Sequence, residues 1–227
     1  MRVHFLSTWT VVCIGLLLSV VSFAQSVSKP EAKQTRRVKG QILTSTYLPP
    51  VRLKFDKAFK HIVSQKFTLF ERAQAEQYYF VDADKQQRIK RMYIVQFEGY
   101  LPNTNATYDY PATKTVELAG QSYIVEAQVV PGVSVVLKQN PQSDAARAVL
   151  FLEGKGYRGG ESVLFQRFVR LVDEAKRNEF ILLYIEDLSS TGFTAADFAK
   201  DGRAFSQKDK ILQELLNRAL KGFTVLN

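Results

Sequence analysis

Cysteine is nearly missing from this chain, which has a single one, Cys13, among 227 residues. Cys13 lies in an apolar run near the amino end, so the remainder of the chain has no thiol for a disulfide, a thiolate metal site or a cysteine nucleophile. Small exported domains often depend on disulfides, but a chain of this length buries enough surface without them. We therefore expect its stability to come from packing.

Histidine is also scarce, and only His4 and His61 are present. Zinc sites built from nitrogen and sulfur ligands are therefore nearly excluded, and we predict no metal and no cofactor. A serine triad would have to use His61, and the sequence contains neither a Gly-x-Ser-x-Gly elbow nor a Walker loop. These absences disfavour the common forms of nucleophilic catalysis.

The first 24 residues have the layout of a cleavable secretory signal peptide. Arg2 and His4 precede the apolar run Val11–Val21, and Ser22 and Ala24 place small residues before a break after residue 24. The run is shorter than the roughly 20 residues that a membrane span needs. We expect an exported protein, periplasmic or extracellular, with a bacterial envelope favoured and no transmembrane segment after cleavage. An uncleaved anchor is the alternative.

Basic side chains outnumber acidic ones, giving a formal net charge of +9. Loss of Arg2 with the leader lowers this to +8. Such a balance favours encounter with anionic surfaces, and export argues against nucleic acid as the partner. The expected partners are an anionic envelope surface or a small amphipathic ligand, and the alternative is that the charge only keeps the protein soluble.

The sequence after the leader divides into a basic lead-in, residues 25–40, and one domain, residues 41–227. The lead-in is polar and predicts a flexible segment. Residues 41–140 have the two-residue alternation of strands. The expected strands are Gln41–Tyr47, the hairpin arms Tyr78–Val81 with Arg91–Phe97, a second pair Thr113–Leu118 with Ser122–Val130, and Val133–Leu137.

Residues 141–227 predict a mostly helical half. Ser143 or Asp144 begins a helix that Gly154 ends, and Leu164, Phe165, Phe168, Leu171 and Val172 recur at steps typical of an amphipathic helix from Glu161. The apolar run Phe180–Ile185 then predicts a strand buried on both faces. Two more helices begin near Thr194 and Ser206.

Together these patterns predict an α+β fold. It has an antiparallel sheet of about five to six strands, with three to four helices, mostly in the C-terminal half, packed on one face. A two-lobed chain that divides near Pro141 is the alternative.

Carboxylates are the candidate catalytic groups, because glycan hydrolysis needs only two of them across a cleft. Five lie on or next to expected strands: Glu98, Glu117, Glu126, Glu186 and Asp187. Glu186 and Asp187 are best placed, at the carboxyl end of the apolar strand. The alternative is that they are ordinary strand-end residues that pair with nearby Lys and Arg.

Tyrosine is concentrated in one region, with seven of the ten between Tyr78 and Tyr123. Its ring is apolar and its tip polar, so a sheet face rich in tyrosine can line a pocket. It equally suits half-buried strands. The candidate ligand-binding residues are Tyr78, Tyr93, Tyr100 and Tyr123, together with the nearby Arg88 and Arg91.

These observations predict an exported, non-catalytic binding or interaction protein for an anionic or small amphipathic ligand. One alternative is a carboxylate-dependent hydrolase of the cell envelope. The other is a structural envelope component.

Overall fold

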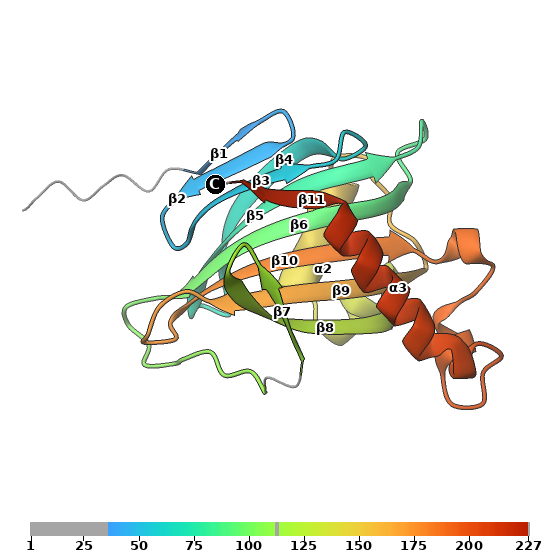
Figure 1. Ribbon diagram of the computed structural model, residues 1–227. Coiled ribbons are helices and arrows are strands. Elements are labelled where there is room, and N and C mark those ends of the chain that lie inside the picture. The colour runs from blue at the N-terminus through green and yellow to red at the C-terminus, as the bar shows by residue number, and fades with distance from the viewer. Residues whose placement is uncertain (1–35, 112–113, 227) are drawn as a thin grey trace, which may run out of the picture. The chain divides into compact units, whose positions relative to one another are not determined.

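Two antiparallel sheets make up most of the chain that the computed structural model describes, residues 36–111 and 114–226 (Figure 1). The larger sheet contains β4 (Lys60–Leu69), β5 (Ala73–Ala83), β6 (Ile89–Tyr100), β7 (Thr115–Leu118), β8 (Gln121–Pro131), β9 (Ser162–Leu171) and β10 (Asn178–Asp187). Its order is β4-β5-β6-β10-β9-β8-β7. The smaller sheet contains β1 (Arg36–Lys39), β2 (Ile42–Thr46), β3 (Pro50–Phe55) and β11 (Phe223–Leu226), in the order β1-β2-β3-β11.

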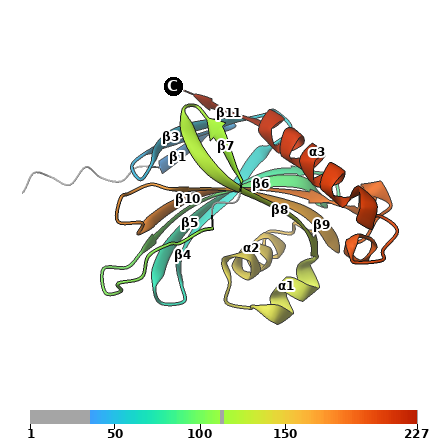
Figure 2. The ribbon, with the colours of Figure 1, turned by 60° about the horizontal axis from the view of Figure 1, so that its bottom comes forward.

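Helices cover both faces of the larger sheet. Figure 2 shows α1 (Val133–Gln139) and α2 (Asp144–Glu153) on one side of it, and α3 (Lys208–Lys221) with the smaller sheet on the other. Short 3₁₀ turns, η1 (Ser189–Thr191), η2 (Ala195–Phe198) and η3 (Phe205–Gln207), connect β10 to α3. None of the helices in the described ranges is long and apolar enough to cross a membrane.

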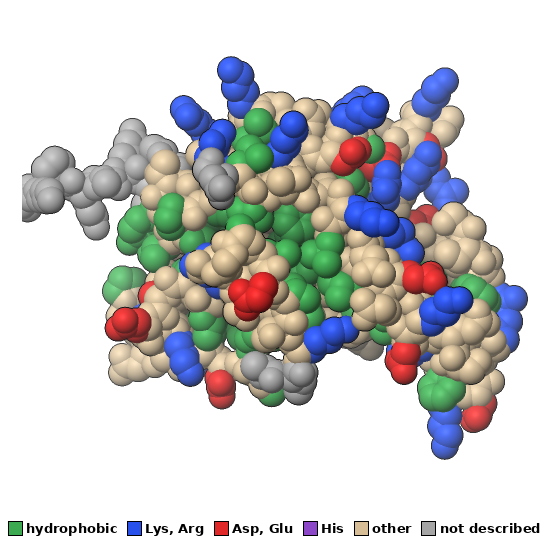
Figure 3. Space-filling model, viewed as in Figure 1, with side chains coloured by type: hydrophobic (Ala, Val, Ile, Leu, Met, Phe, Trp, Pro, Cys, Tyr) green, Lys and Arg blue, Asp and Glu red, His purple; other side chains and the backbone are tan. Residues whose placement is uncertain are grey.

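The two faces of the larger sheet carry separate hydrophobic clusters. The cluster under α3 and the smaller sheet is rich in aromatic rings, among them Phe55, Tyr93, Phe168 and Tyr184. The Tyr93 hydroxyl donates to the Ala219 carbonyl at 2.5 Å and ties β6 to α3. In Figure 3 hydrophobic side chains gather in the middle of this side of the molecule, and Lys and Arg project mainly from its upper and right edges.

The cluster on the opposite face is smaller and mostly aliphatic. It joins β5, β6, β9 and β10 to α2 through Tyr79, Ile94, Leu152, Val169 and Ile181. The candidate site described below lies on this face.

The predicted α+β fold is wrong, because the described chain is mostly β. Instead of one sheet of five to six strands with helices on one face, the described residues form eleven strands in two sheets, with three α-helices placed on both faces of the larger one. The half from residue 141, predicted to be mostly helical, contains β9, β10 and β11.

The largest single error is the helix predicted from Glu161, because Ser162–Leu171 is strand β9. Its even-numbered side chains, such as Leu164 and Phe168, face the aromatic cluster, and Phe165 and Val169 face the aliphatic one. Apolar residues on both faces of a strand produce three- and four-residue steps by coincidence. The aromatic and β-branched side chains of this segment favour a strand.

The strand predicted at Val133–Leu137 is also wrong, because these residues belong to α1. Gly132 lies between β8 and α1 and explains why the chain changes direction there. Its amide donates to the Glu161 carbonyl at 2.6 Å, and a Cβ at Gly132 would overlap the backbone of Gly160 and Glu161. The chain therefore leaves the sheet at this close approach.

Several local predictions are confirmed. The strand over Phe180–Ile185 is the centre of β10, the two hairpins are β5–β6 and β7–β8, and α2 begins after the Ser143 cap, whose hydroxyl accepts from Ala146 N at 3.1 Å. The helix expected near Thr194 is only the 3₁₀ turn η2, although Thr194 and Asp197 form a capping box at its start.

The predicted signal peptide lies outside the described residues, as does most of the predicted lead-in. The last part of the lead-in, Arg36–Lys39, differs from the prediction because it forms β1 against β2. The described residues, 36–111 and 114–226, belong to one compact unit.

Candidate functional site

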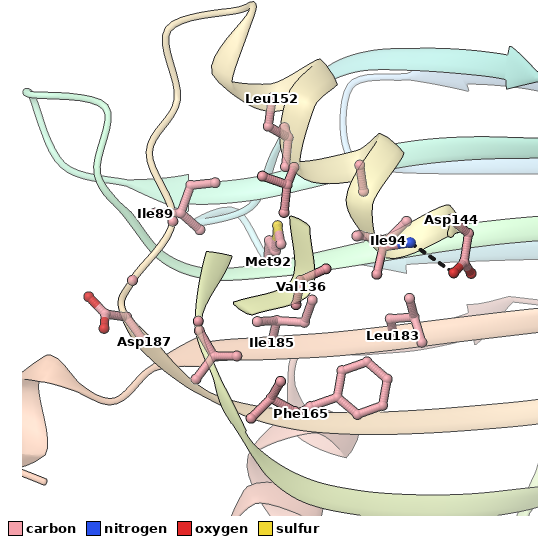
Figure 4. A pocket seen from close by; sticks show the side chains of 18 of the residues that line it. Ile89, Met92, Ile94, Val136, Asp144, Leu152, Phe165, Leu183, Ile185 and Asp187 are labelled. Atoms are coloured by element: carbon pink, nitrogen blue, oxygen red, sulfur yellow. Dashed lines mark hydrogen bonds between the residues drawn. The ribbon is translucent and has the colours of Figure 1, made fainter. Parts of the chain in front are cut away.

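A cavity of about 280 Å³ lies between the larger sheet and the helices α1 and α2. Figure 4 shows that the side chains gathered in it come from β6, β9, β10, α1 and α2. Most are aliphatic or aromatic, and they include Ile89, Met92, Ile94, Val136, Ala148, Leu152, Phe165, Leu183 and Ile185. We call this space the apolar cavity.

Strand alternation builds the floor of the apolar cavity. Met92 and Ile94 of β6 stand opposite Ile185 and Leu183 of β10, and Phe165 of β9 stands opposite Ile185, so these side chains share one face. Helix α2 forms the roof through Ala148 and Leu152, which are 3 % and 4 % exposed. The space therefore results from an amphipathic helix lying over an apolar sheet face.

Each end of the apolar cavity carries a carboxylate, Asp187 at one end and Asp144 at the other (Figure 4). Asp187 is engaged by its own turn: it accepts from Ser189 N at 2.9 Å and from the Ser189 hydroxyl at 2.7 Å, and Arg88 approaches to 4.0 Å. Asp144 begins α2 and accepts from Gln96 Nε2 at 3.2 Å. The Asp144 end is therefore linked to polar groups of the sheet.

A row of amide side chains crosses the sheet at the Asp144 end. Gln65 donates to Gln77 at 2.9 Å, Gln77 donates to Gln96 at 2.5 Å, and Gln96 donates to Glu98 at 2.6 Å. Gln77 and Gln96 are 1 % and 0 % exposed. Because each amide donates toward the same end of the row, Glu98 is its final acceptor.

Glu98 and Glu179 are direct cross-strand partners on β6 and β10. They are 8 % and 3 % exposed, and both line a second cavity of about 620 Å³, which also includes Tyr100, Tyr108 and Tyr110. We call it the tyrosine cavity. The two cavities share Asp144, Arg167 and Ile181 as lining residues, so they adjoin at the Asp144 end.

Strand β6 and its connection to β7 supply the tyrosines. The Tyr108 hydroxyl donates to Glu98 at 2.8 Å, and the Tyr110 hydroxyl donates to Glu179 at 2.5 Å. Tyr100 and Tyr108 stack with ring centroids 4.3 Å apart. Arg177 anchors the connection, since its guanidinium donates to the carbonyls of Leu101, Thr104 and Ala106 at 2.8, 2.6 and 3.3 Å.

Burial perturbs the acid groups of the tyrosine cavity. It raises the pKa of Glu179 to about 7, an effect that the Tyr110 hydrogen bond and the nearby Arg167 charge partly offset and the Glu98 charge strengthens. Burial also raises the pKa of Glu98, against two hydrogen bonds that favour its ionised form. Burial therefore makes both carboxyls of this pair hold a proton more readily than a solvated carboxyl does.

Arg167 is the only basic residue that lines both cavities within the described chain. Its guanidinium pairs with Glu126 at 2.6 Å and lies 5.3 Å from the Tyr110 ring centroid. Its charge is therefore already shared with an outer carboxylate.

The structure separates the two predicted catalytic carboxylates. Asp187 lines the apolar cavity, as described. Glu186 points to the opposite face, where Arg218 of α3 donates to it at 2.8 Å and the Tyr184 hydroxyl also donates. The chain therefore does not bring Glu186 and Asp187 together in one cavity.

Of the four tyrosines predicted to bind ligand, the structure places only Tyr100 at either of these two cavities. Tyr78, Tyr93 and Tyr123 are buried in the aromatic cluster on the other face. These three tyrosines are therefore part of the hydrophobic core and line neither cavity.

The two predicted arginines lie near one end of β6. Arg88 is exposed beside Asp187. Arg91 pairs with Asp82 at 2.8 Å and lies 5.1 Å from the Phe59 ring centroid.

Glu179 was not among the predicted site residues. The usable signal was alternation within β10, which puts Glu179 on the same face as Ile181, Leu183 and Ile185. Its partner Glu98 was one of the five carboxylates near strands, but their pairing depends on the register of β6 and β10.

Other common site types are missing from this part of the chain. No group of three or more His, Cys, Asp or Glu that could hold a metal ion occurs in residues 36–111 and 114–226. Gly154, Gly156 and Gly159 have the spacing of a dinucleotide-binding loop, but they follow helix α2 and lead toward strand β9, the reverse of the order that such a loop requires. Comparison with known protein families, curated proteins and solved structures finds no match to this chain.

Proposed function

We propose that this protein, once exported, binds small amphipathic molecules whose apolar part occupies the apolar cavity. The observation that carries the proposal is the aliphatic lining of this space between the sheet and α2. Small-molecule sites are mostly apolar and contain a few polar groups that orient the ligand. The Asp144 end supplies such groups.

The size of the apolar cavity supports a small ligand. Its volume of about 280 Å³ is near the lower end of the range for ligand sites, roughly 300–1,000 Å³. It is well above the roughly 150 Å³ at which an apolar cavity accepts a benzene-sized guest. A short aliphatic chain or a single ring system fits this range.

A cavity-filling variant tests the proposal. Ala148→Leu adds three carbons to a side chain that faces the cavity, whereas Leu150→Phe enlarges a side chain on the outer face of the same helix, where Leu150 is 54 % exposed. Calorimetric titration with 1-octanol should show saturable binding to the wild-type protein and to Leu150→Phe, and binding at least tenfold weaker to Ala148→Leu. Equal binding to all three folded proteins would refute the assignment of the cavity.

A second candidate function is carboxylate-dependent hydrolysis. The observation that favours it is the opposed pair Glu98 and Glu179, in which Glu179 has a pKa of about 7 and can serve as a general acid. A screen of envelope glycans and esters would test it. Any turnover should disappear in Glu179→Gln, and turnover that persists in this variant would remove the assignment.

A further inference from the structure

The two ends of the apolar cavity differ in what they offer to a ligand. The Asp187 oxygens are occupied by Ser189 and faced by Arg88. At the Asp144 end the apolar cavity adjoins the tyrosine cavity, where Glu179 is 97 % buried and yet lines the space. Among the described residues, Tyr110 donates to Glu179 Oε2, and no donor reaches Oε1. Glu179 therefore lines this cavity with one oxygen bonded to Tyr110 and with hydrogen-bonding capacity left on the other.

Acidic groups dominate the charges at this junction. Glu98 of β6, Glu179 of β10 and Asp144 of α2 line it, against Arg167 of β9 and the exposed Arg72. Arg167 pairs with Glu126 through Nη2, and its charge also acts on Glu179, so it compensates part of this negative charge. Carboxyl groups outnumber the basic groups of the lining, so once ionised they would repel an anionic head group and complement a cationic one.

Aromatic rings add a second, independent preference. Tyr100 and Tyr108 line the same cavity as the carboxylates, and so does Tyr110, whose ring already has the Arg167 guanidinium 5.3 Å from its centroid. The face of a tyrosine ring attracts a cation with about 0.5–2 kcal/mol, and aromatic cages are a common way to hold ammonium groups. Rings and carboxylates together therefore favour the same class of head group.

We propose that the ligand is a cationic amphiphile, whose aliphatic part fills the apolar cavity and whose ammonium head lies in the tyrosine cavity beside Glu179 and Glu98. This inference rests on the proposed binding function. It reverses the anionic preference that the net charge of the chain predicts, because the basic side chains that Figure 3 shows project from the surface, whereas Glu98 and Glu179 are buried.

Three ligands with the same octyl chain and different heads test the inference. They are octyltrimethylammonium, which is cationic, 1-octanol, which is neutral, and octyl sulfate, which is anionic. None of the three titrates between pH 5 and pH 8, so any pH dependence of the affinity comes from the protein. Only binding that Ala148→Leu weakens is counted, which removes surface association. At pH 8 the ammonium compound should bind at least tenfold more tightly than octyl sulfate.

Variants and pH then locate the head group. Glu179→Gln should bring the affinity for the ammonium compound close to that for 1-octanol, while Glu117→Gln, an exposed change on β7, should leave it unchanged. At pH 5, where Glu179 is protonated, the ammonium preference of the wild-type protein should fall several-fold. The groups that face Glu179 are Glu98, Tyr108, Tyr110, Arg167 and Asp144, and burial raises the pKa of the Glu98 carboxyl as well.

The outcomes separate the two proposals. If 1-octanol binds in an Ala148→Leu-sensitive way and octyl sulfate binds as tightly as the ammonium compound, the head-group inference is wrong and the binding function stands. If none of the octyl compounds shows such binding, both proposals are wrong.

Discussion

Replacement of Glu179 by glutamine should stabilise the protein at pH 8 and leave its stability nearly unchanged at pH 4. Glu179 is 3 % exposed, and burial raises its pKa to about 7 from 4.5. The folded protein therefore holds this proton more tightly than the unfolded chain does. Glutamine keeps the shape of the protonated carboxyl and cannot ionise.

The magnitude follows from proton linkage. Below pH 4.5 the carboxyl is protonated in both states, so it imposes no penalty. Between pH 4.5 and 7 the unfolded chain loses the proton and the folded protein keeps it, so the free energy of unfolding falls as pH rises, and it levels off above pH 7. At about 1.4 kcal/mol for each tenfold change in proton affinity, this interval corresponds to about 3 kcal/mol.

Urea unfolding at pH 4, 6 and 8 measures the effect. The gain from Glu179→Gln should grow with pH toward about 3 kcal/mol at pH 8. Glu117→Gln is the control, since Glu117 is exposed on β7 and its replacement should change stability by less than about 0.5 kcal/mol at every pH. A gain from Glu179→Gln that is the same at pH 4 and pH 8 would refute the reasoning.

Two further predictions concern the same region. Arg177→Ala removes three hydrogen bonds to carbonyls of the β6–β7 connection and should lower the free energy of unfolding by about 2–4 kcal/mol. Hydrogen exchange should become faster only in residues 101–110. The control Arg158→Ala, at an exposed position, should lower the free energy of unfolding by less than about 0.5 kcal/mol. A double-mutant cycle of Glu98→Gln and Glu179→Gln should give a coupling free energy of at least about 0.5 kcal/mol at pH 8, because like charges on direct cross-strand partners repel. The coupling should vanish at pH 4. No coupling at pH 8 would contradict the register of β6 and β10.

The sequence predicted the elements that carry unambiguous local signals. Phe180–Ile185 has no polar interruption, and Ser143 with Gly154 marks both ends of α2, so the prediction of each was confirmed. Segment 162–171 had no such signal. It is covered on both faces, and its apolar positions fit a helix as well as a strand until its neighbours β8 and β10 are known.

The candidate site was harder to predict than the elements that form it. Glu98 and Glu179 are far apart in the chain, and only the pairing of β6 with β10 places them side by side. The tyrosine content was noticed, but the number of rings does not tell which face of a strand they take. Tyr93 faces the aromatic cluster, whereas Tyr108 reaches Glu98 from a connection that Arg177 holds in place.

The buried pair of Glu98 and Glu179 lowers the stability of the folded protein, and the fold does not need carboxyl groups at these positions. An apolar side chain at Glu179 would extend the cluster of Ile181 and Leu183 and remove a group whose ionisation opposes folding at neutral pH. Positions where a chain gives up stability in this way are often its functional sites. A cationic ligand would offset the cost, because it stabilises the ionised form of Glu179. Binding of a cation near pH 6 should therefore release a proton from Glu179. The affinity for the cation then depends on the ionisation of Glu179, the same group whose ionisation destabilises the ligand-free protein.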